Sequence, residues 1–163
     1  MSITFSHPDA SDLTEIMRIE QSGFTPDEAA TRDSMAERIK LINDTFIIAK
    51  NEQGQIMGYV VGPAYHNRYL ADDLFDQTVP NDPKDSYIAV LSLVVLPDFQ
   101  GQHVASQLLS ELDAVAKQQQ RTGISLTCLE NLIPFYERNG YVNEGVSDST
   151  HADETWYNLV KVL

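Results

Sequence analysis

One stretch of this 163-residue chain, residues 87–112, constrains its fold more than any other. It begins with the apolar run YIAVLSLVVL, which ends at Pro97. Such a run is typical of a strand buried on both faces, and a proline cannot donate a hydrogen bond to a sheet. Further on, apolar residues recur with the period of a helix that has one buried stripe, at Val104, Leu108, Leu112 and Val115. The sequence therefore predicts a strand, a short polar turn and a helix.

The turn between these two elements has the features of a phosphate-binding site. It reads Gln-Gly-Gln-His-Val-Ala over residues 100–105. The first N–H groups of a helix have no partner within it, and together with the positive end of the helix dipole they attract an anion. A phosphate in that position is bound through backbone amides alone. We therefore expect the amides of residues 101–106 to bind a phosphate group.

A second segment, residues 128–141, reads CLENLIPFYERNGY. It follows an expected strand over residues 124–129, and Asn131 is a good N-cap for a short helix. Pro134 falls in the first turn of that helix, where its missing N–H does no harm. Gly140 is suited to the left-handed conformation that ends a helix, and Tyr141 then begins another strand.

These two segments resemble the two landmarks of the GNAT superfamily, the acyl-CoA-dependent N-acyltransferases. Residues 100–105 match the Q/R-x-x-G-x-G/A pyrophosphate turn, except that His103 stands where the family pattern has its first glycine. The second segment matches an asparagine followed by Phe-Tyr and then Gly-Tyr. The segments LIPFYERNGY and, earlier in the chain, IEQSGF are similar to sequences of the serotonin (arylalkylamine) N-acetyltransferase-like branch. The resemblance covers nearly the whole chain and is strongest over residues 87–145.

The resemblance implies an α/β (α+β) architecture, the acyl-CoA N-acyltransferase fold. That fold has a mixed, mostly antiparallel sheet of six to seven strands flanked by about four helices. The sequence pattern agrees with one domain over residues 1–163, which is long enough to bury a core. A helix is expected after Pro8, and a second is expected to begin at Thr25 with Glu28 completing a capping box. The expected strands cover residues 2–6, 45–49, 55–61, 87–96, 124–129, 142–146 and 155–162.

Residues 62–86, called the acidic loop below, contain three of the seven prolines and five aspartates. Their pattern predicts no regular structure beyond one short helix around residues 68–76. A loop of this length is unusual in a compact domain unless it is functional or mobile. In the family the corresponding region borders the acceptor site, and the same is expected here.

Charge and composition argue against several classes of partner. The net charge of −13 sets up a field that repels nucleic acid and anionic lipid, so neither nucleic acid nor a membrane is an expected partner. The sequence shows no signal-peptide pattern and no apolar stretch of membrane-spanning length. The single cysteine, Cys128, lies in an apolar strand and is expected to be a buried apolar residue rather than a nucleophile. No histidine has a second ligand at metal spacing, so no metal is expected. We expect a cytoplasmic monomer or homodimer.

The resemblance also implies which residues form the site. Acetyl-CoA is the implied co-substrate, with its pantetheine arm along a strand edge and an amide near Val94 directed at the thioester carbonyl. Tyr136 is the implied general acid for the departing thiolate, and Glu20 and Phe24 lie in the region expected to contact the acceptor. Whether Lys117, Arg121 or Arg138 meets the nucleotide phosphate stays open. The implied CoA-binding residues are Leu93, Val94, Val95, Gln100, Gly101, Gln102, His103, Val104, Ala105, Ser106, Asn131 and Tyr136.

The route of the amine proton is where the sequence departs from the branch that it resembles. Two histidines of that branch correspond here to Ala89 and Leu91, which cannot take up a proton. The amine proton can leave by either of two routes, through water to backbone carbonyls or to a carboxylate such as Glu20, and the sequence does not decide between them. The implied reaction is direct acetyl transfer to a primary amine of a small molecule. Acetylation of a protein or peptide and a non-catalytic acyl-CoA sensor are the alternatives.

Overall fold

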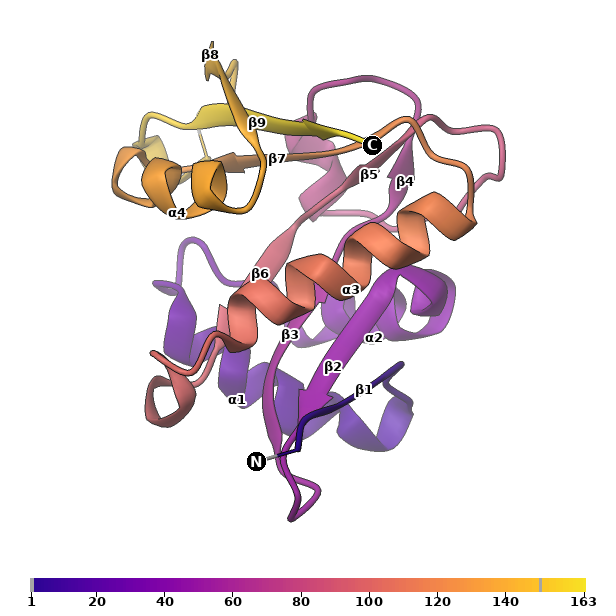
Figure 1. Cartoon of the computed structure of the whole chain (residues 1–163), viewed down its shortest axis with the longest axis vertical. Helices are drawn as coiled ribbons and strands as arrows, with labels where there is room; N and C mark the ends of the chain where they lie inside the picture. The colour runs from indigo at the N-terminus through magenta and orange to yellow at the C-terminus, as the bar shows by residue number, and fades with distance from the viewer. Residues whose placement is uncertain (1, 150) are drawn as a thin grey trace.

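The structure, a computed structural model, describes residues 2–149 and 151–163 and contains two sheets (Figure 1). The first sheet has the order β1-β2-β3-β6 and is antiparallel throughout. The second has the order β4-β5-β7-β9-β8, and in it only β5 and β7 run parallel. The strands are β1 Thr4–Ser6, β2 Phe46–Lys50, β3 Ile56–Val61, β4 Ala64–Tyr65, β5 Tyr87–Ala89, β6 Ser92–Val95, β7 Gly123–Cys128, β8 Val142–Val146 and β9 Tyr157–Val162.

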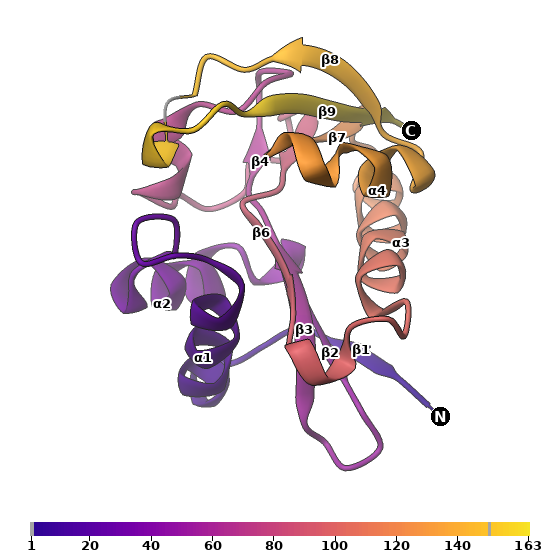
Figure 2. The ribbon, with the colours of Figure 1, turned by 90° about the vertical axis from the view of Figure 1, so that its left-hand side faces the viewer.

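Helices cover both faces of the first sheet (Figure 2). The α-helices of the described chain are α1 Leu13–Gly23, α2 Arg32–Leu41, α3 Val104–Gln118 and α4 Ile133–Arg138. Leu108 and Leu112 of α3 pack in one core cluster with Ile47 of β2, whereas Ile16 of α1 packs in a second cluster with Ile48. Successive side chains of a strand point to opposite faces, so the same strands serve both clusters. None of the helices within the described ranges is both long and apolar enough to cross a membrane.

The strands expected from the sequence are present, and the acidic loop holds more structure than expected. It contributes the short strand β4, and its 3-10 helix covers Asp72–Phe75 in place of the helix expected around residues 68–76. The largest difference concerns residues 87–96. They were expected to form one strand, but they form β5 in one sheet and β6 in the other.

The main chain is bonded on its β3–β4 side both before and after Val90, but it loses its bonds to β7 after this residue. The amide of Val90 donates to the carbonyl of Ser125 in β7 at 2.8 Å, whereas the amide of Leu91 donates to the carbonyl of Val61 in β3, also at 2.8 Å. From this point β6 pairs with β3 and leaves β7. A gap therefore opens between β6 and β7, and this gap positions the site.

The second helix does not begin where the sequence predicts. The amide and the hydroxyl of Thr25 both donate to the carboxylate of Glu28 at 3.0 Å, which is the backward contact of a capping box. This turn is not continued into a helix. Thr31 has an extended backbone and caps α2 instead, with its hydroxyl accepting a backbone amide of the first turn at 3.1 Å. The expected start at Thr25 is therefore wrong, because the local contact closes only a single turn.

The acidic loop is tied to both sheets. Near its start, the Nε and Nη2 atoms of Arg68 donate to the two carboxylate oxygens of Glu144 in β8, at 2.8 and 2.5 Å. The hydroxyl of Tyr69 donates to the same carboxylate at 2.6 Å. Near its end, the side-chain amide of Asn81 donates to Asp44, just before β2, at 2.8 Å. The loop thus spans from the second sheet to the first.

Gly62 makes the close approach of two backbone segments beside the end of β5 possible. A Cβ atom at this position would lie 1.9 Å from the carbonyl oxygen of Ala89. Gly62→Ala is expected to lower the free energy of unfolding by about 3 kcal/mol or more, because backbone atoms must move apart. Urea and thermal denaturation measure the loss. Gly54→Ala is the control: its φ is +77° and no atom lies within 4 Å, so only the left-handed backbone penalty of about 1 kcal/mol applies. Equal losses for the two variants would contradict this account.

The Glu144 contact predicts how the acidic loop responds to pH. The hydrogen bonds from Arg68 and Tyr69 lower the pKa of Glu144 from 4.5 to about 2. Because the pKa is lower in the folded state, the contribution of the charged pair is complete above about pH 4.5 and is lost as the pH falls through about 2. Glu144→Gln should therefore reproduce at neutral pH the loosening that acid causes in the unmodified protein.

The measurement is amide hydrogen exchange over residues 66–70, which is expected to become faster in Glu144→Gln. The free energy of unfolding should change by less than about 1 kcal/mol, since the pair is partly exposed to solvent. Glu137→Gln, on an exposed residue of α4, is the matched control and should leave the exchange unchanged. Equal exchange in all three proteins would show that the pair does not hold the loop.

Candidate active site

The turn before α3 has the geometry of an anion-binding site. Gly101 (φ 82°) and His103 (φ 63°) both have left-handed backbone conformations, and His103 occupies the N-cap position of α3. Glycine adopts this conformation freely, and histidine tolerates it better than most residues. The backbone amides of residues 101–106 donate no hydrogen bond to any group within residues 2–149 and 151–163. Residues 101–103 are exposed, so the amides near them are available to a ligand.

A cleft of about 450 Å³ runs along this turn. Of the three basic residues left open by the sequence, Arg138 of α4 borders the cleft. Lys117 lies in the last turn of α3, at the opposite end of that helix. Arg121 is buried and donates to the carbonyls of Asp82 and Asp85, each at 2.7 Å. Arg138 is therefore the best placed of the three to meet a phosphate at the turn.

Strand β6 offers one open edge. It pairs with β3 on one side, where the amide of Leu96 donates to β3 at 2.9 Å. Because hydrogen-bonded pairs alternate along an antiparallel ladder, the amide of Val94 also faces β3, and those of Leu93 and Val95 face the gap. The carbonyl of Val95 is on the open side, where it accepts the side-chain amide of Gln100 at 3.0 Å. The amide of Val94 therefore does not reach the gap, whereas those of Leu93 and Val95 do. The side chain of Val94 packs in the core beside α1.

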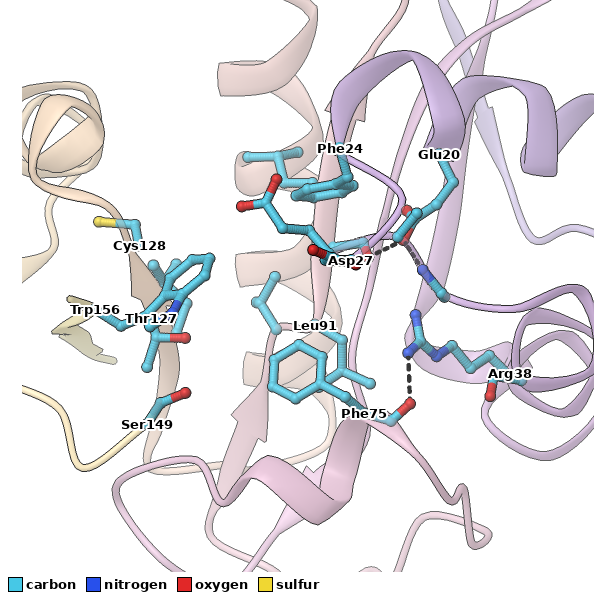
Figure 3. A pocket seen from close by; sticks show the side chains of 18 of the residues that line it. Glu20, Phe24, Asp27, Arg38, Phe75, Leu91, Thr127, Cys128, Ser149 and Trp156 are labelled. Carbon is cyan, nitrogen blue, oxygen red and sulfur yellow. Dashed lines mark hydrogen bonds between the residues drawn. The ribbon is translucent and has the colours of Figure 1, made fainter. Parts of the chain in front are cut away.

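A cavity of about 210 Å³ lies in the gap between β6 and β7 and extends to α2 (Figure 3). Strand residues and α4 form one wall, α1 and α2 with the segment between them form another, and the acidic loop closes a third side. The residues used below that line it are Glu20, Phe24, Asp27, Glu28, Arg38, Phe75, Asp76, Leu91, Leu93, Leu132, Cys128, Tyr136 and Trp156.

Tyr136 and Cys128 border the cavity from α4 and β7. Tyr136 is 7% exposed, and the described residues provide no hydrogen-bond partner for its hydroxyl. Burial, and secondly the neighbouring Cys128, raises the pKa of Tyr136 above its usual value of 10, so its hydroxyl is protonated at neutral pH. Burial raises the pKa of Cys128 to about 12, so this side chain is a thiol rather than a thiolate. The pair therefore offers a proton donor but no nucleophile.

Glu20 and Phe24, which are expected from the sequence to contact the acceptor, border the same cavity. Glu20 is only 1% exposed. One of its carboxylate oxygens accepts a hydrogen bond from the hydroxyl of Tyr59, and the other accepts from the amide of Ala30 at 2.9 Å and from the hydroxyl of Ser92 at 3.4 Å. Three donors therefore hold this buried carboxylate in place.

Asn131 lies apart from the cavity. It is exposed within the 3-10 helix Glu130–Leu132, and the N-cap position of α4 belongs to Leu132. The expectation that Asn131 caps α4 is therefore wrong, because the 3-10 turn precedes the helix. Asn131 borders a separate groove, which it shares with Pro134 and Tyr157. Its contact with CoA is not supported by this position.

Arg38 is a buried charged residue of the cavity that was not predicted from the sequence. It is 1% exposed and lies on the buried face of α2, together with Met35 and Ile39. The signal was present, because Arg38 follows Met35 by three residues and precedes Ile42 by four, on the apolar stripe of the helix. Phe75 and Trp156 also line the cavity. They lie in the helix and the strand expected around residues 68–76 and over residues 155–162, and neither pattern indicated contact with the site.

Comparisons with known proteins agree with this architecture. The model of a family described as acetyltransferase (GNAT) domain matches residues 43–143, which include the open strand edge, the turn and α4. A search of curated proteins found no match.

Solved structures match over nearly the whole chain. The loading GNATL domain of CurA from Lyngbya majuscula has a TM-score of 0.81 at 14% identity, over 99% of this chain and 98% of that one. The GphF GNAT-like decarboxylase in complex with isobutyryl-CoA has a TM-score of 0.83 at 15% identity, over 98% of each chain. Ard1 from Thermoplasma volcanium has a TM-score of 0.80 at 16% identity, over 100% of this chain and 99% of that one. At these identities the likeness concerns the fold, and it confirms the fold class expected from the sequence.

The left-handed conformation of His103 predicts a ranking of variants at the turn. His103→Val should lower the free energy of unfolding by about 1 to 2 kcal/mol, because a β-branched residue is strained in this conformation. His103→Gly should stay within about 1 kcal/mol of the unmodified protein, since the strain relieved offsets the greater freedom of glycine in the unfolded chain. Urea denaturation of the three proteins measures the ranking, and a His103→Val variant as stable as His103→Gly would contradict it.

Proposed function

The chain belongs to the GNAT acetyltransferase family, and on this premise we propose that it transfers an acetyl group from acetyl-CoA directly to a primary amine of a small molecule. The amine nitrogen forms a bond to the acetyl carbon, and the bond between that carbon and sulfur breaks. A protonated amine loses two protons in this reaction, of which one ends on the sulfur and the other in solvent. We also propose that residues 1–163 form one such domain.

The observation that supports this proposal most strongly is the row of free amides at residues 101–106, next to the open edge of β6. The amides and Arg138 suit a diphosphate, and they supply positive character in a chain whose net charge is −13. When bound, acetyl-CoA supplies the thioester whose acyl carbon is the electrophile. The amides of Leu93 and Val95 are the donors available to hold the pantetheine arm and to polarise the thioester carbonyl.

Tyr136 is suited to deliver the proton that the leaving sulfur needs. Its hydroxyl is protonated at neutral pH, because burial raises its pKa, and it borders the cavity at the gap. A positioned donor of this kind typically contributes about a hundredfold or more to the rate. The neutral thiol of Cys128 is a poor nucleophile, which supports direct transfer over a covalent acyl-enzyme.

The cavity supports a small acceptor over a protein or peptide. Its volume of about 210 Å³ is below the range of about 300–1,000 Å³ that drug-sized ligands occupy. Phe75 and Asp76 of the acidic loop form part of its wall, so the loop covers the acceptor side rather than leaving an open groove. The narrower assignment to the serotonin (arylalkylamine) N-acetyltransferase-like branch rests on the two sequence motifs alone. A non-catalytic acyl-CoA sensor is the second candidate, because Ala89 and Leu91 provide no base.

Turnover with a panel of primary amines tests the proposal. The unmodified protein, mixed with acetyl-CoA and aryl, alkyl or amino-acid amines, is expected to release free thiol at a rate that depends on the amine. Tyr136→Phe should lower kcat by about a hundredfold, because the leaving sulfur loses its proton donor.

Cys128→Ala is the matched control, since it removes the thiol that neighbours Tyr136 on this wall and should keep kcat within about threefold. Binding of CoA, measured by calorimetry, separates the two candidates. CoA that binds without thiol release with any amine, and with equal affinity in Tyr136→Phe, would favour the sensor and reject the transferase.

A further inference from the structure

Two buried arginines in this protein have opposite surroundings. Arg121 is 7% exposed and is well bonded: it donates to two backbone carbonyls at 2.7 Å and to the side chain of Gln119 at 3.1 Å. Arg38 is 1% exposed, yet its one hydrogen bond within the described chain is a long contact of 3.3 Å from Nη2 to the carbonyl of Phe75. Its Nε and Nη1 atoms are buried and have no acceptor among the described residues.

This guanidinium, with two of its three nitrogens unbonded in the described part of the chain, borders the cavity. Figure 3 shows Arg38 reaching in from α2 on the side opposite Cys128, with its guanidinium near Phe75 and Leu91. Glu20 is the nearby buried carboxylate, but no oxygen of Glu20 lies within 4 Å of a nitrogen of Arg38, and its own oxygens accept from three neutral donors. A buried charged donor without an acceptor is costly, so a ligand that supplies the acceptor gains the corresponding free energy.

A carboxylate matches a guanidinium well, because its two oxygens accept two parallel N–H bonds. The rest of the cavity wall is largely apolar, with the aromatic side chains of Phe24, Phe75 and Trp156. Asp27 and Asp76 line the cavity as well, and as exposed residues they favour the approach of a cationic amine. These features suit a small molecule that has a carboxylate, an apolar side chain and an ammonium group.

We infer that the acceptor is a free amino acid with an apolar side chain, whose carboxylate binds Arg38 and whose amine points across the cavity toward the open edge of β6. This inference rests on the proposed function and adds the substrate class. The carboxylate takes no part in the bond changes: the amine gains the acetyl group as before, and the product is an N-acetyl amino acid. Arg38 is thus a specificity-determining residue, distinct from the proton donor Tyr136.

Matched substrate pairs test the inference in the unmodified protein. Phenylalanine and 2-phenylethylamine differ only by the carboxylate, as do leucine and 3-methylbutylamine. With acetyl-CoA, kcat/KM for each amino acid is expected to exceed that of its partner by roughly 10- to 100-fold, the range for a hydrogen bond to a charged group. Phenylalaninamide controls for amine basicity, since it keeps an electron-withdrawing carbonyl but has no negative charge.

Variants then locate the effect. Arg38→Met should reduce the preference for phenylalanine over 2-phenylethylamine to nearly one, mainly through KM, and Arg38→Lys should restore part of it. Arg32→Met is the matched control, because Arg32 is an exposed arginine of the same helix that donates to Thr14, and the preference should be unchanged.

A binding measurement covers the case in which Arg38→Met does not fold. In the unmodified protein, N-acetylphenylalanine is expected to raise the Tm, and N-acetyl-2-phenylethylamine at the same concentration is expected to raise it much less. This comparison requires neither a variant nor turnover.

The outcomes separate the inference from the proposed function. Equal kcat/KM for both members of each pair overturns the inference and leaves the acetyltransferase intact. Absence of turnover with every amine, together with Arg38-dependent binding of malonyl-CoA or succinyl-CoA in preference to acetyl-CoA, assigns the carboxylate to the acyl chain and overturns the amino-acid acceptor. Absence of both turnover and carboxylate-dependent stabilisation overturns the inference and the proposed function together.

Discussion

The end of pairing with β7 after Val90, while bonds on the β3–β4 side continue, is the constraint on which the rest of this structure depends. The segment pairs with β7 up to Val90, and on its other side it pairs first with β4 and then with β3, so two strands that start side by side diverge. The divergence leaves one edge of β6 unpaired, opens the cavity between β6 and β7, and directs the end of β6 toward the turn before α3. Unpaired backbone groups at a strand edge inside a protein are costly unless a ligand or another segment bonds to them. Here the unpaired edge lies next to the free amides of the turn.

Much of this framework was predictable from local pattern. The apolar run ending at Pro97, the helical spacing after Val104 and the glycine at 140 each specify an element through its own residues, and each element is present. The division of residues 87–96 into two strands was not predictable. An apolar run has the same sequence pattern whether its strand stays paired on both sides or loses one neighbouring strand partway along. The errors at Thr25 and Asn131 have a related cause. Both residues carry a good capping signal, but the signal specifies a single turn and does not determine where a longer helix begins.

The part of the candidate site that is formed by main-chain groups was predictable from the sequence. The amides of residues 101–106 follow from the position of the turn before a helix, whatever the side chains. Arg38 could not be assigned in this way, because its environment is formed by segments distant in sequence. Its hydrogen bond to the carbonyl of Phe75 joins two residues that are 37 positions apart in the sequence. The position of Arg38 on the apolar face of α2 could be seen in the sequence. Arginine is usually exposed to solvent, however, so its burial was not expected.

The acidic loop acts as a brace across the two sheets. It is anchored to β8 through Arg68 and Glu144, to the segment before β2 through Asn81, and to α2 through the bond from Arg38 to the carbonyl of Phe75. The last of these anchors uses the same guanidinium that, in the inference above, binds a carboxylate. If the inference holds, one side chain contacts both the ligand and the loop that covers the cavity, so the position of the loop and the occupancy of the cavity are coupled through Arg38.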